Sequence, residues 1–165
     1  MAHLVLTDAS PLIGLARVNG LIWLADLFGE VIMPVEVRKE VLAGSGLSDE
    51  EAILMAEAAG VLRTWPRLAP DEPDLPDLDE GESACIRIAL ASAAPALVLM
   101  DERAGRAVAI EKGLRVAGTA AVIGMAKMKG LIPLASMVFA RLHASDFRIS
   151  PQVIKTILLR VGETL

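Results

Sequence analysis

The chain has 165 residues, 54% of them hydrophobic, which is enough apolar material for the core of one domain. One cysteine and two histidines exclude an internal disulfide and a structural zinc site, so any bound metal must be held by oxygen, and the lack of tyrosine argues against base-stacking modules. The net charge of -5 is unevenly divided: residues 1–100 hold 6 basic and 16 acidic side chains, whereas residues 101–165 hold 10 basic and 5 acidic ones. A basic C-terminal part suits contact with phosphates, although a solvated surface without a partner explains it as well.

The first half of the chain alternates short apolar runs with segments of helical spacing. Glycine, proline and capping residues mark the boundaries between them. We predict, in order, a strand at 4–7, a helix capped by Ser10 and opened by Pro11, an apolar stretch at 21–28 closed by Gly29, a strand at 31–33, a helix at 35–43 after Pro34, a helix at 52–59 behind a Ser48–Glu51 capping box, and an edge strand at 61–64.

The second half begins with a surface loop, because residues 65–79 contain four prolines among acidic side chains. The later elements follow the same alternation. We predict a helix at 80–93 capped by Asp79, a buried strand at 96–100, a helix at 102–112, a strand at 114–117, a helix capped by Thr119 and reaching 129, a helix at 135–143, and a last helix capped by Ser150.

This βαβα order predicts an α/β fold, a three-layer α/β/α arrangement around a mostly parallel sheet. We expect one domain over residues 1–165, with residues 134–165 forming C-terminal helices packed on it. The last helix has an apolar face, which either packs on its own domain or meets a partner. The longest apolar stretch, 84–100, contains Arg87 and Pro95, and no secretory signal is recognisable, so we expect a cytoplasmic protein.

Three acidic residues stand where ligands bind in such a fold, at the carboxyl ends of parallel strands. Asp8 follows the first strand, Asp101 follows the 96–100 strand, and Glu82 lies in the first turn of a helix. Each also has an ordinary explanation: Asp8 can fix a turn, Glu82 can complete a capping box with Asp79, and Asp101 can cap its helix.

Carboxylates brought together repel one another, and a cluster of them persists mainly when a hard cation neutralises it. A site of oxygen ligands without His or Cys suits Mg²⁺, which can activate water and offset charge on a phosphate. A fourth ligand can come from the helix after Pro34, where Glu36 and Glu40 share a face, although for Glu36 a solvated charged face is slightly the better explanation.

Four ordered segments give the chain a resemblance to a known family. LTDASPLIGLARV is followed by FGEVIMPVEVRKEVL, LDEGESACIRIAL and LVLMDERAGRAVAIEKGLRVAGT, and GLI and FRISPQVI extend the likeness to residue 154. In order and spacing they resemble a prokaryotic branch of the PIN-domain family, close to VapC-like toxins. The resemblance implies a Mg²⁺- or Mn²⁺-dependent ribonuclease that acts on RNA, and its toxin branch implies an antitoxin protein that holds it inactive.

The resemblance also implies the site residues. It assigns Asp8, Glu40, Glu82 and Asp101 to the catalytic metal cluster, with Ser10 and Thr119 as supporting hydroxyls. By their own chemistry, Glu36 on the helix face of Glu40 and Arg103, whose guanidinium suits phosphate, are further supporting candidates. Ser10 and Thr119 are equally plausible as plain helix caps, and an ion pair with Glu102 explains Arg103 as well as a phosphate contact does.

The sequence departs from the better-studied toxins after Asp101. A second acidic residue often follows there, and here Arg103 and Arg106 stand instead. This leaves a catalytically weak or inactive module that binds RNA or a partner as the alternative function. Apolar surface on the first and last helices favours a homodimer, and we expect no membrane contact.

Overall fold

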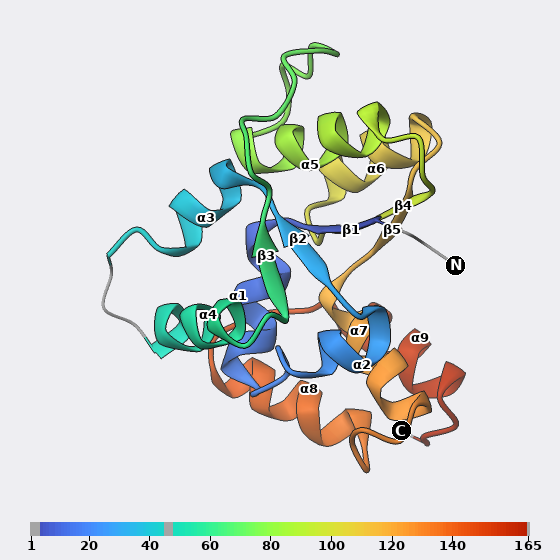
Figure 1. Ribbon diagram of the computed structural model, residues 1–165. Helices are drawn as coiled ribbons and strands as arrows, with labels where there is room; N and C mark the ends of the chain where they lie inside the picture. The colour runs from blue at the N-terminus through green and yellow to red at the C-terminus, as the bar shows by residue number, and fades with distance from the viewer. Residues whose placement is uncertain (1–3, 45–47, 165) are drawn as a thin grey trace.

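The computed structural model describes residues 4–44 and 48–164, and its centre is a five-stranded, entirely parallel sheet (Figure 1). The strand order is β3-β2-β1-β4-β5. The strands are β1 (Leu4–Thr7), β2 (Val31–Met33), β3 (Leu62–Thr64), β4 (Ala96–Leu99) and β5 (Arg115–Ala117). The predicted α/β class and parallel sheet are confirmed, and β3 lies at an edge as predicted.

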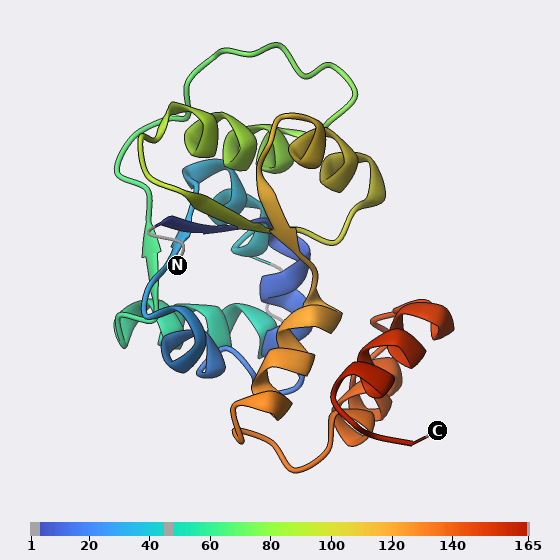
Figure 2. The ribbon, with the colours of Figure 1, turned by 90° about the vertical axis from the view of Figure 1, so that its right-hand side faces the viewer.

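Helices cover both faces of this sheet. The helices are α1 (Ala9–Arg17), α2 (Trp23–Phe28), α3 (Val35–Val41), α4 (Ser48–Ala58), α5 (Glu80–Ala91), α6 (Arg103–Glu111), α7 (Thr119–Met128), α8 (Ala135–Ala144) and α9 (Pro151–Arg160). Figures 1 and 2 show α5 and α6 on one face, α1, α4 and α7 on the other, and α8 and α9 outside α7. The result is a three-layer arrangement.

The neighbouring strands β1 and β4 are buried on both sides, which explains their largely apolar sequences. Their register is continuous, from Leu4 opposite Ala96 to Thr7 opposite Leu99. The backbone N–H of Asp8 donates to the carbonyl of Leu99 at 2.9 Å and carries this pairing one residue further. The residues that follow β1 and β4 therefore emerge side by side.

Several predicted boundaries differ from those observed. The helix after Pro34 ends at Val41 rather than residue 43, and α4 already begins at Ser48, so the predicted box of Ser48 and Glu51 lies inside the helix. The residue that would cap α4 lies outside the described residues. The helix at 80–93 ends at Ala91.

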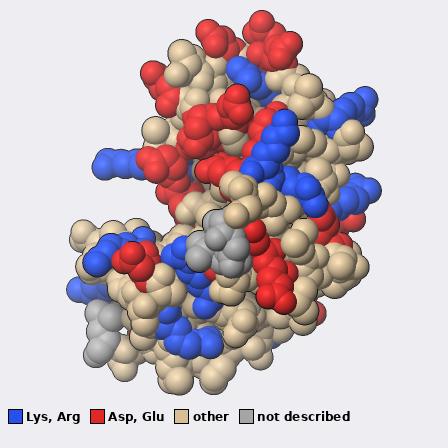
Figure 3. Space-filling model, turned by 90° about the vertical axis from the view of Figure 1, so that its left-hand side faces the viewer, with Lys and Arg blue, Asp and Glu red and all other residues tan. Residues whose placement is uncertain are grey.

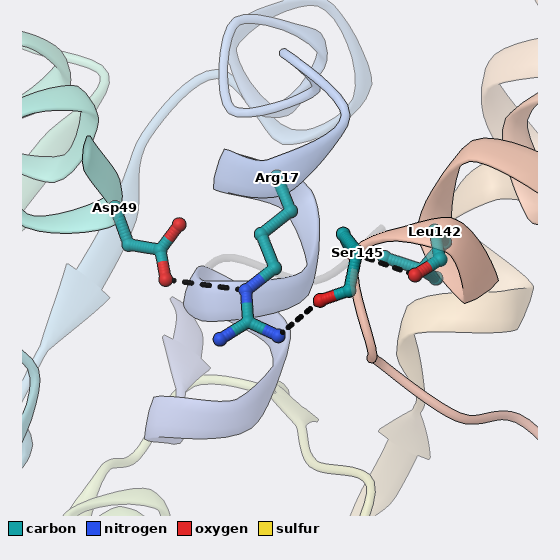
Figure 4. A network of polar contacts seen from close by, with 4 residues as sticks. All are labelled: Arg17, Asp49, Leu142 and Ser145. Carbon is teal, nitrogen blue, oxygen red and sulfur yellow. Dashed lines mark hydrogen bonds and ion pairs between the residues drawn. The ribbon is translucent and has the colours of Figure 1, made fainter. Parts of the chain in front are cut away.

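Arg17, at the end of α1, ties together two elements far away in the sequence (Figure 4). Its Nε donates to Oδ2 of Asp49 at 3.2 Å, in the first turn of α4, and its Nη1 donates to the carbonyl of Ser145 at 3.0 Å, just after α8. The fork of a guanidinium permits both bonds at once. Among the described residues, no helix is long and apolar enough to cross a membrane.

Candidate metal and substrate site

Asp8 is a buried carboxylate that does not cap the helix it precedes. Its side chain is 5% exposed, and Oδ1 has no hydrogen-bond partner. Asp8 occupies the N-cap position of α1 but makes no side-chain capping bond, so the explanation that it fixes this turn is not supported. The pKa of Asp8 is raised from 3.8 to about 7, mainly by burial and also by the charges of Asp79, Glu82 and Glu40, which together outweigh the lowering by one backbone hydrogen bond.

Glu82 takes part in a helix cap and still keeps an oxygen unpaired. Its backbone N–H donates to Oδ1 of Asp79 at 2.8 Å, and its Oε1 accepts from the backbone N–H of Asp79 at 3.2 Å. This is the predicted capping box, which is therefore confirmed. The other oxygen, Oε2, is buried and has no partner, and burial raises the pKa of Glu82, as does the charge of Asp79.

Glu40 and Glu36 lie on α3, which packs against α5, the helix that carries Glu82. A Cβ added at Gly81 would lie 2.9 Å from Oδ1 of Asp8 and 3.4 Å from Oε2 of Glu40, so both carboxylates border this glycine. Burial and the charge of Asp79 raise the pKa of Glu40. Oε1 of Glu36 is buried without a partner. Figure 3 shows acidic side chains gathered on the face that carries α3 and the start of α5.

Asp101 is held in a different way, by hydroxyl and amide donors. The backbone N–H of Thr119 donates to Oδ1 at 2.7 Å, Oγ1 of Thr119 donates to Oδ2 at 2.7 Å, and Oγ of Ser10 donates to Oδ2 at 3.0 Å. The capping roles predicted for Ser10 and Thr119 are wrong, because both are already helical and the N-cap positions belong to Asp8 and Gly118. Asp101 does not cap α6 either, since Glu102 occupies that position.

Three glycines make room for the carboxylates. Gly81 lies between Asp8 and Glu40, as described above. A Cβ at Gly105 would collide with Oε2 of Glu82, and one at Gly118 would lie 2.8 Å from Oδ1 of Asp101. Sequence reasoning missed these glycines and also Asp79, which it treated only as a cap. A sequence signal was present for two of them, since Gly81 and Gly105 each lie beside a charged residue in the first turn of a helix.

The two arginines after Asp101 differ in their contacts. Nη1 of Arg106 donates to the carbonyl of Met100 at 3.1 Å, whereas Arg103 is exposed and forms no hydrogen bond or ion pair with the described residues. The alternative ion pair between Arg103 and Glu102 is therefore not observed. Both arginines line a groove of about 930 Å³ that also contains Asp101 and Ser10.

The unpaired oxygens of Asp8 and Glu82, together with Glu40 and Asp79, offer the donor set that Mg²⁺ or Mn²⁺ prefers. Buried carboxylates that lack donors and repel one another are stabilised when a cation enters. Within residues 4–44 and 48–164, however, no three Asp, Glu, His or Cys side chains already stand in a metal-holding arrangement. The oxygens of Asp101 are turned to Ser10 and Thr119, so a cation shared with Asp101 requires side-chain movement.

Comparison with known proteins agrees with this architecture. A family model described as a PIN domain matches residues 4–163, nearly the whole chain. No curated protein matches the sequence.

Proposed function

The chain belongs to the PIN-domain family, and from this premise we propose that it is a metal-dependent endoribonuclease. Proteins of this family are generally metal-dependent nucleases, that is, hydrolases of phosphodiester bonds. The proposal adds that the substrate is RNA, that Mg²⁺ or Mn²⁺ is the cofactor, and that Asp8, Glu40, Glu82 and Asp101 form the catalytic cluster.

The observation that carries the proposal is the pair of buried, unpaired oxygens on Asp8 and Glu82. An unsatisfied buried carboxylate oxygen costs free energy, on the order of 1–3 kcal/mol or more for a charged group. Here the two oxygens belong to one cluster of acids, in which burial and neighbouring negative charges raise the pKa of both Asp8 and Glu82. A cation-binding role explains the unpaired oxygen on each acid, which the capping box of Glu82 leaves unexplained.

The chain's own residues would divide the work at such a site. Asp8 and Glu82 would bind the cation with their free oxygens, and Glu40, on the exposed side, would complete the negative field. Ser10 and Thr119 orient Asp101 through three hydrogen bonds, which makes them positioning residues. A bound Mg²⁺ or Mn²⁺ would supply positive charge that offsets the charge developing on the phosphate oxygens.

Within the family, we propose the VapC-like role of a toxin that is restrained by an antitoxin, in the cytoplasm and as a homodimer. The likeness of the four sequence segments supports this role. A short upstream reading frame that encodes a small DNA-binding or helical protein would support the pairing. Co-purification of the chain with that protein would test it directly.

A second candidate is a non-catalytic module that binds RNA or a protein partner. It is favoured by the hydrogen bonds that already occupy Asp101 and by the arginines that follow it in place of a further acid. Cleavage distinguishes the two candidates, because both allow RNA binding and only the first cuts RNA.

The deciding experiment incubates purified protein with mixed RNAs and Mg²⁺ or Mn²⁺. Wild type is compared with Asp8→Asn and Asp101→Asn, and with Glu111→Gln, an exposed acid on α6, as a matched control. We expect cleavage by wild type and the control, and loss of at least about a hundredfold in the two site variants. Equal products from all four proteins would refute the ribonuclease, and binding without any cleavage would favour the second candidate.

A further inference from the structure

The groove beside Asp101 has a charge opposite to that of the carboxylate cluster. Four arginines line it, Arg103 and Arg106 from α6, Arg148 from the segment before α9, and Arg160 from the end of α9, against two acidic residues, Asp101 and Glu102. The whole chain, by contrast, carries a net charge of -5. The C-terminal excess of basic residues is thus concentrated in part on this groove.

These arginines are available to a ligand. Arg103, Arg148 and Arg160 are exposed, and none forms a hydrogen bond or an ion pair with the residues that the structure describes. Arg106 uses Nη1 on the carbonyl of Met100 and keeps further N–H donors. Guanidinium groups present a planar fork of donors that matches phosphate oxygens, so the groove is suited to a polyanion.

The helix directions add to the positive charge of the groove. The starts of α6, α7 and α9 all border the groove, through Arg103, Ala120 and Ser150 respectively. Each helix N-terminus carries a partial positive charge and favours an anion nearby. Figure 2 looks toward these three helices, with α6 above and α9 beside α7.

The position of α9, and with it Arg160, is set by close packing on α7. A Cβ at Gly124 would lie 2.9 Å from Cγ2 of Ile157, so the absence of a side chain at Gly124 permits this approach. Ile157 and Leu158 are buried in this contact region. The C-terminal helix is thus a fixed wall of the groove, and Ile110, Val153 and Ile157 give the groove an apolar lining between the arginines.

We propose that this groove binds the sugar–phosphate backbone of single-stranded RNA on one side of the cleaved bond. Arg148 and Arg160, in the C-terminal part of the chain, are the binding residues most distant in sequence from the carboxylates. That the RNA strand runs from this groove toward Asp101 rests on the proposed function. A single strand fits the mixed lining, because its phosphates can meet arginines while its bases lie on apolar side chains. Phe147, the groove's aromatic residue, is half-buried with its ring close to Gly14, so we expect little base preference from this groove.

The test measures binding separately from cleavage. Fluorescein-labelled oligouridylate is titrated by fluorescence anisotropy in EDTA, where no metal supports cleavage, with Arg148→Ala, Arg160→Ala, the double variant, and Lys155→Ala as control. Lys155 is an exposed cation on the same helix α9 that does not line the groove. Because both arginines are exposed, their loss leaves the fold intact, which a thermal melt verifies.

We expect the double variant to bind about tenfold more weakly than wild type, and the slope of log affinity against log salt to fall by about 0.7 for each lost phosphate contact. The Lys155→Ala variant should bind as wild type does. Equal affinity and slope in the double variant and wild type would overturn the proposal, as would tighter binding of polyglutamate than of the oligonucleotide. Neither result depends on whether wild type cleaves RNA, so failure of the groove and failure of the nuclease proposal remain distinguishable.

Discussion

Thr119 engages both oxygens of Asp101, with its backbone N–H on Oδ1 and its hydroxyl on Oδ2, each at 2.7 Å. Thr119 is fully buried at the start of α7, so the side chain of Asp101 is fixed to a rigid element across the end of β5. Ser10 adds a third donor from α1. The orientation of Asp101 is therefore determined by two helices that lie far from it in the sequence.

Replacing Thr119 by valine should loosen Asp101 without changing the volume of the core. One hydroxyl donor is lost, so we expect a loss of about 1–2 kcal/mol in the free energy of unfolding, measured by urea denaturation, and tighter Mn²⁺ binding, because Oδ2 of Asp101 becomes freer to turn toward the cation. Thr119→Ser retains the donor and should restore the wild-type Mn²⁺ affinity. Identical Mn²⁺ affinity in Thr119→Val and wild type would show that this contact positions nothing.

Ionisation of Asp8 should destabilise the metal-free protein as the pH rises. Its pKa in the fold is about 7 against an ordinary 3.8, so the folded state holds the proton more tightly and the stabilisation is lost as the pH rises through about 7. In EDTA, the free energy of unfolding of Asp8→Asn should exceed that of wild type by on the order of 3 kcal/mol at about pH 8, and by much less at about pH 4. Thermal or urea unfolding at both pH values measures this.

The control for this prediction is Asp26→Asn, an exposed acid on α2. It should follow wild type at every pH. A stability difference between Asp8→Asn and wild type that does not change with pH would contradict the assignment of a raised pKa to Asp8.

Gly105→Ala should have the opposite effect to that usual in a helix. Alanine normally stabilises a helix by up to about 1 kcal/mol relative to glycine, but here the added methyl group would occupy the space of Oε2 of Glu82 and press on Sδ of Met100. We expect a lower free energy of unfolding, measured by urea denaturation, and weaker Mn²⁺ binding, measured by calorimetry. The matched control is Ala104→Gly, an exposed neighbour, which should lose some stability and retain Mn²⁺ affinity.

Glu163→Gln should release the start of α8 from the C-terminal segment. The carboxylate accepts from the backbone N–H of Ala135 at 2.6 Å and of Ser136 at 3.0 Å, with Nζ of Lys127 at 3.8 Å. Burial alone would raise the pKa of Glu163, but these backbone donors hold it below its usual range. The stabilisation is therefore present above an ordinary pKa of 4.5 and is lost as the pH falls through the lowered value.

At neutral pH, we expect Glu163→Gln to lower the free energy of unfolding by about 1–3 kcal/mol, and this difference from wild type should shrink in acid. Unfolding curves at neutral and acidic pH provide the measurement. A variant as stable as wild type at neutral pH would show that the segment does not hold α8.

Local sequence signals were sufficient for most of the fold. The buried strand β4 is uniformly apolar, and the capping box of Asp79 and Glu82 has the spacing that only a helix start requires, so both were predicted correctly. The carboxyl-end position of Asp8 and Asp101 also follows from the sequence, because each residue comes directly after a predicted strand. Boundaries such as the end of α3 depend on tertiary packing and were placed less well.

The polar contacts of the site could not be predicted in the same way. Ser10 and Thr119 stand beside proline and glycine at helix starts, where a cap is the commonest role of a hydroxyl. Their actual acceptor, Asp101, lies 91 and 18 residues away along the chain. The role of Gly105 likewise depends on Glu82, which approaches it from another helix. Such contacts are set by the packing of elements and leave no local sequence pattern.

The central claim is that Asp8 and Glu82 lend their unpaired oxygens to a divalent cation. Calorimetric titration of Mn²⁺ into metal-free wild type, Asp8→Asn, Glu82→Gln and the exposed control Glu80→Gln, from the same helix turn, tests it most directly. We predict saturable binding to wild type and Glu80→Gln, and affinity lowered at least about tenfold in Asp8→Asn and Glu82→Gln. Absence of binding to wild type, or equal binding to all four proteins, would contradict the claim.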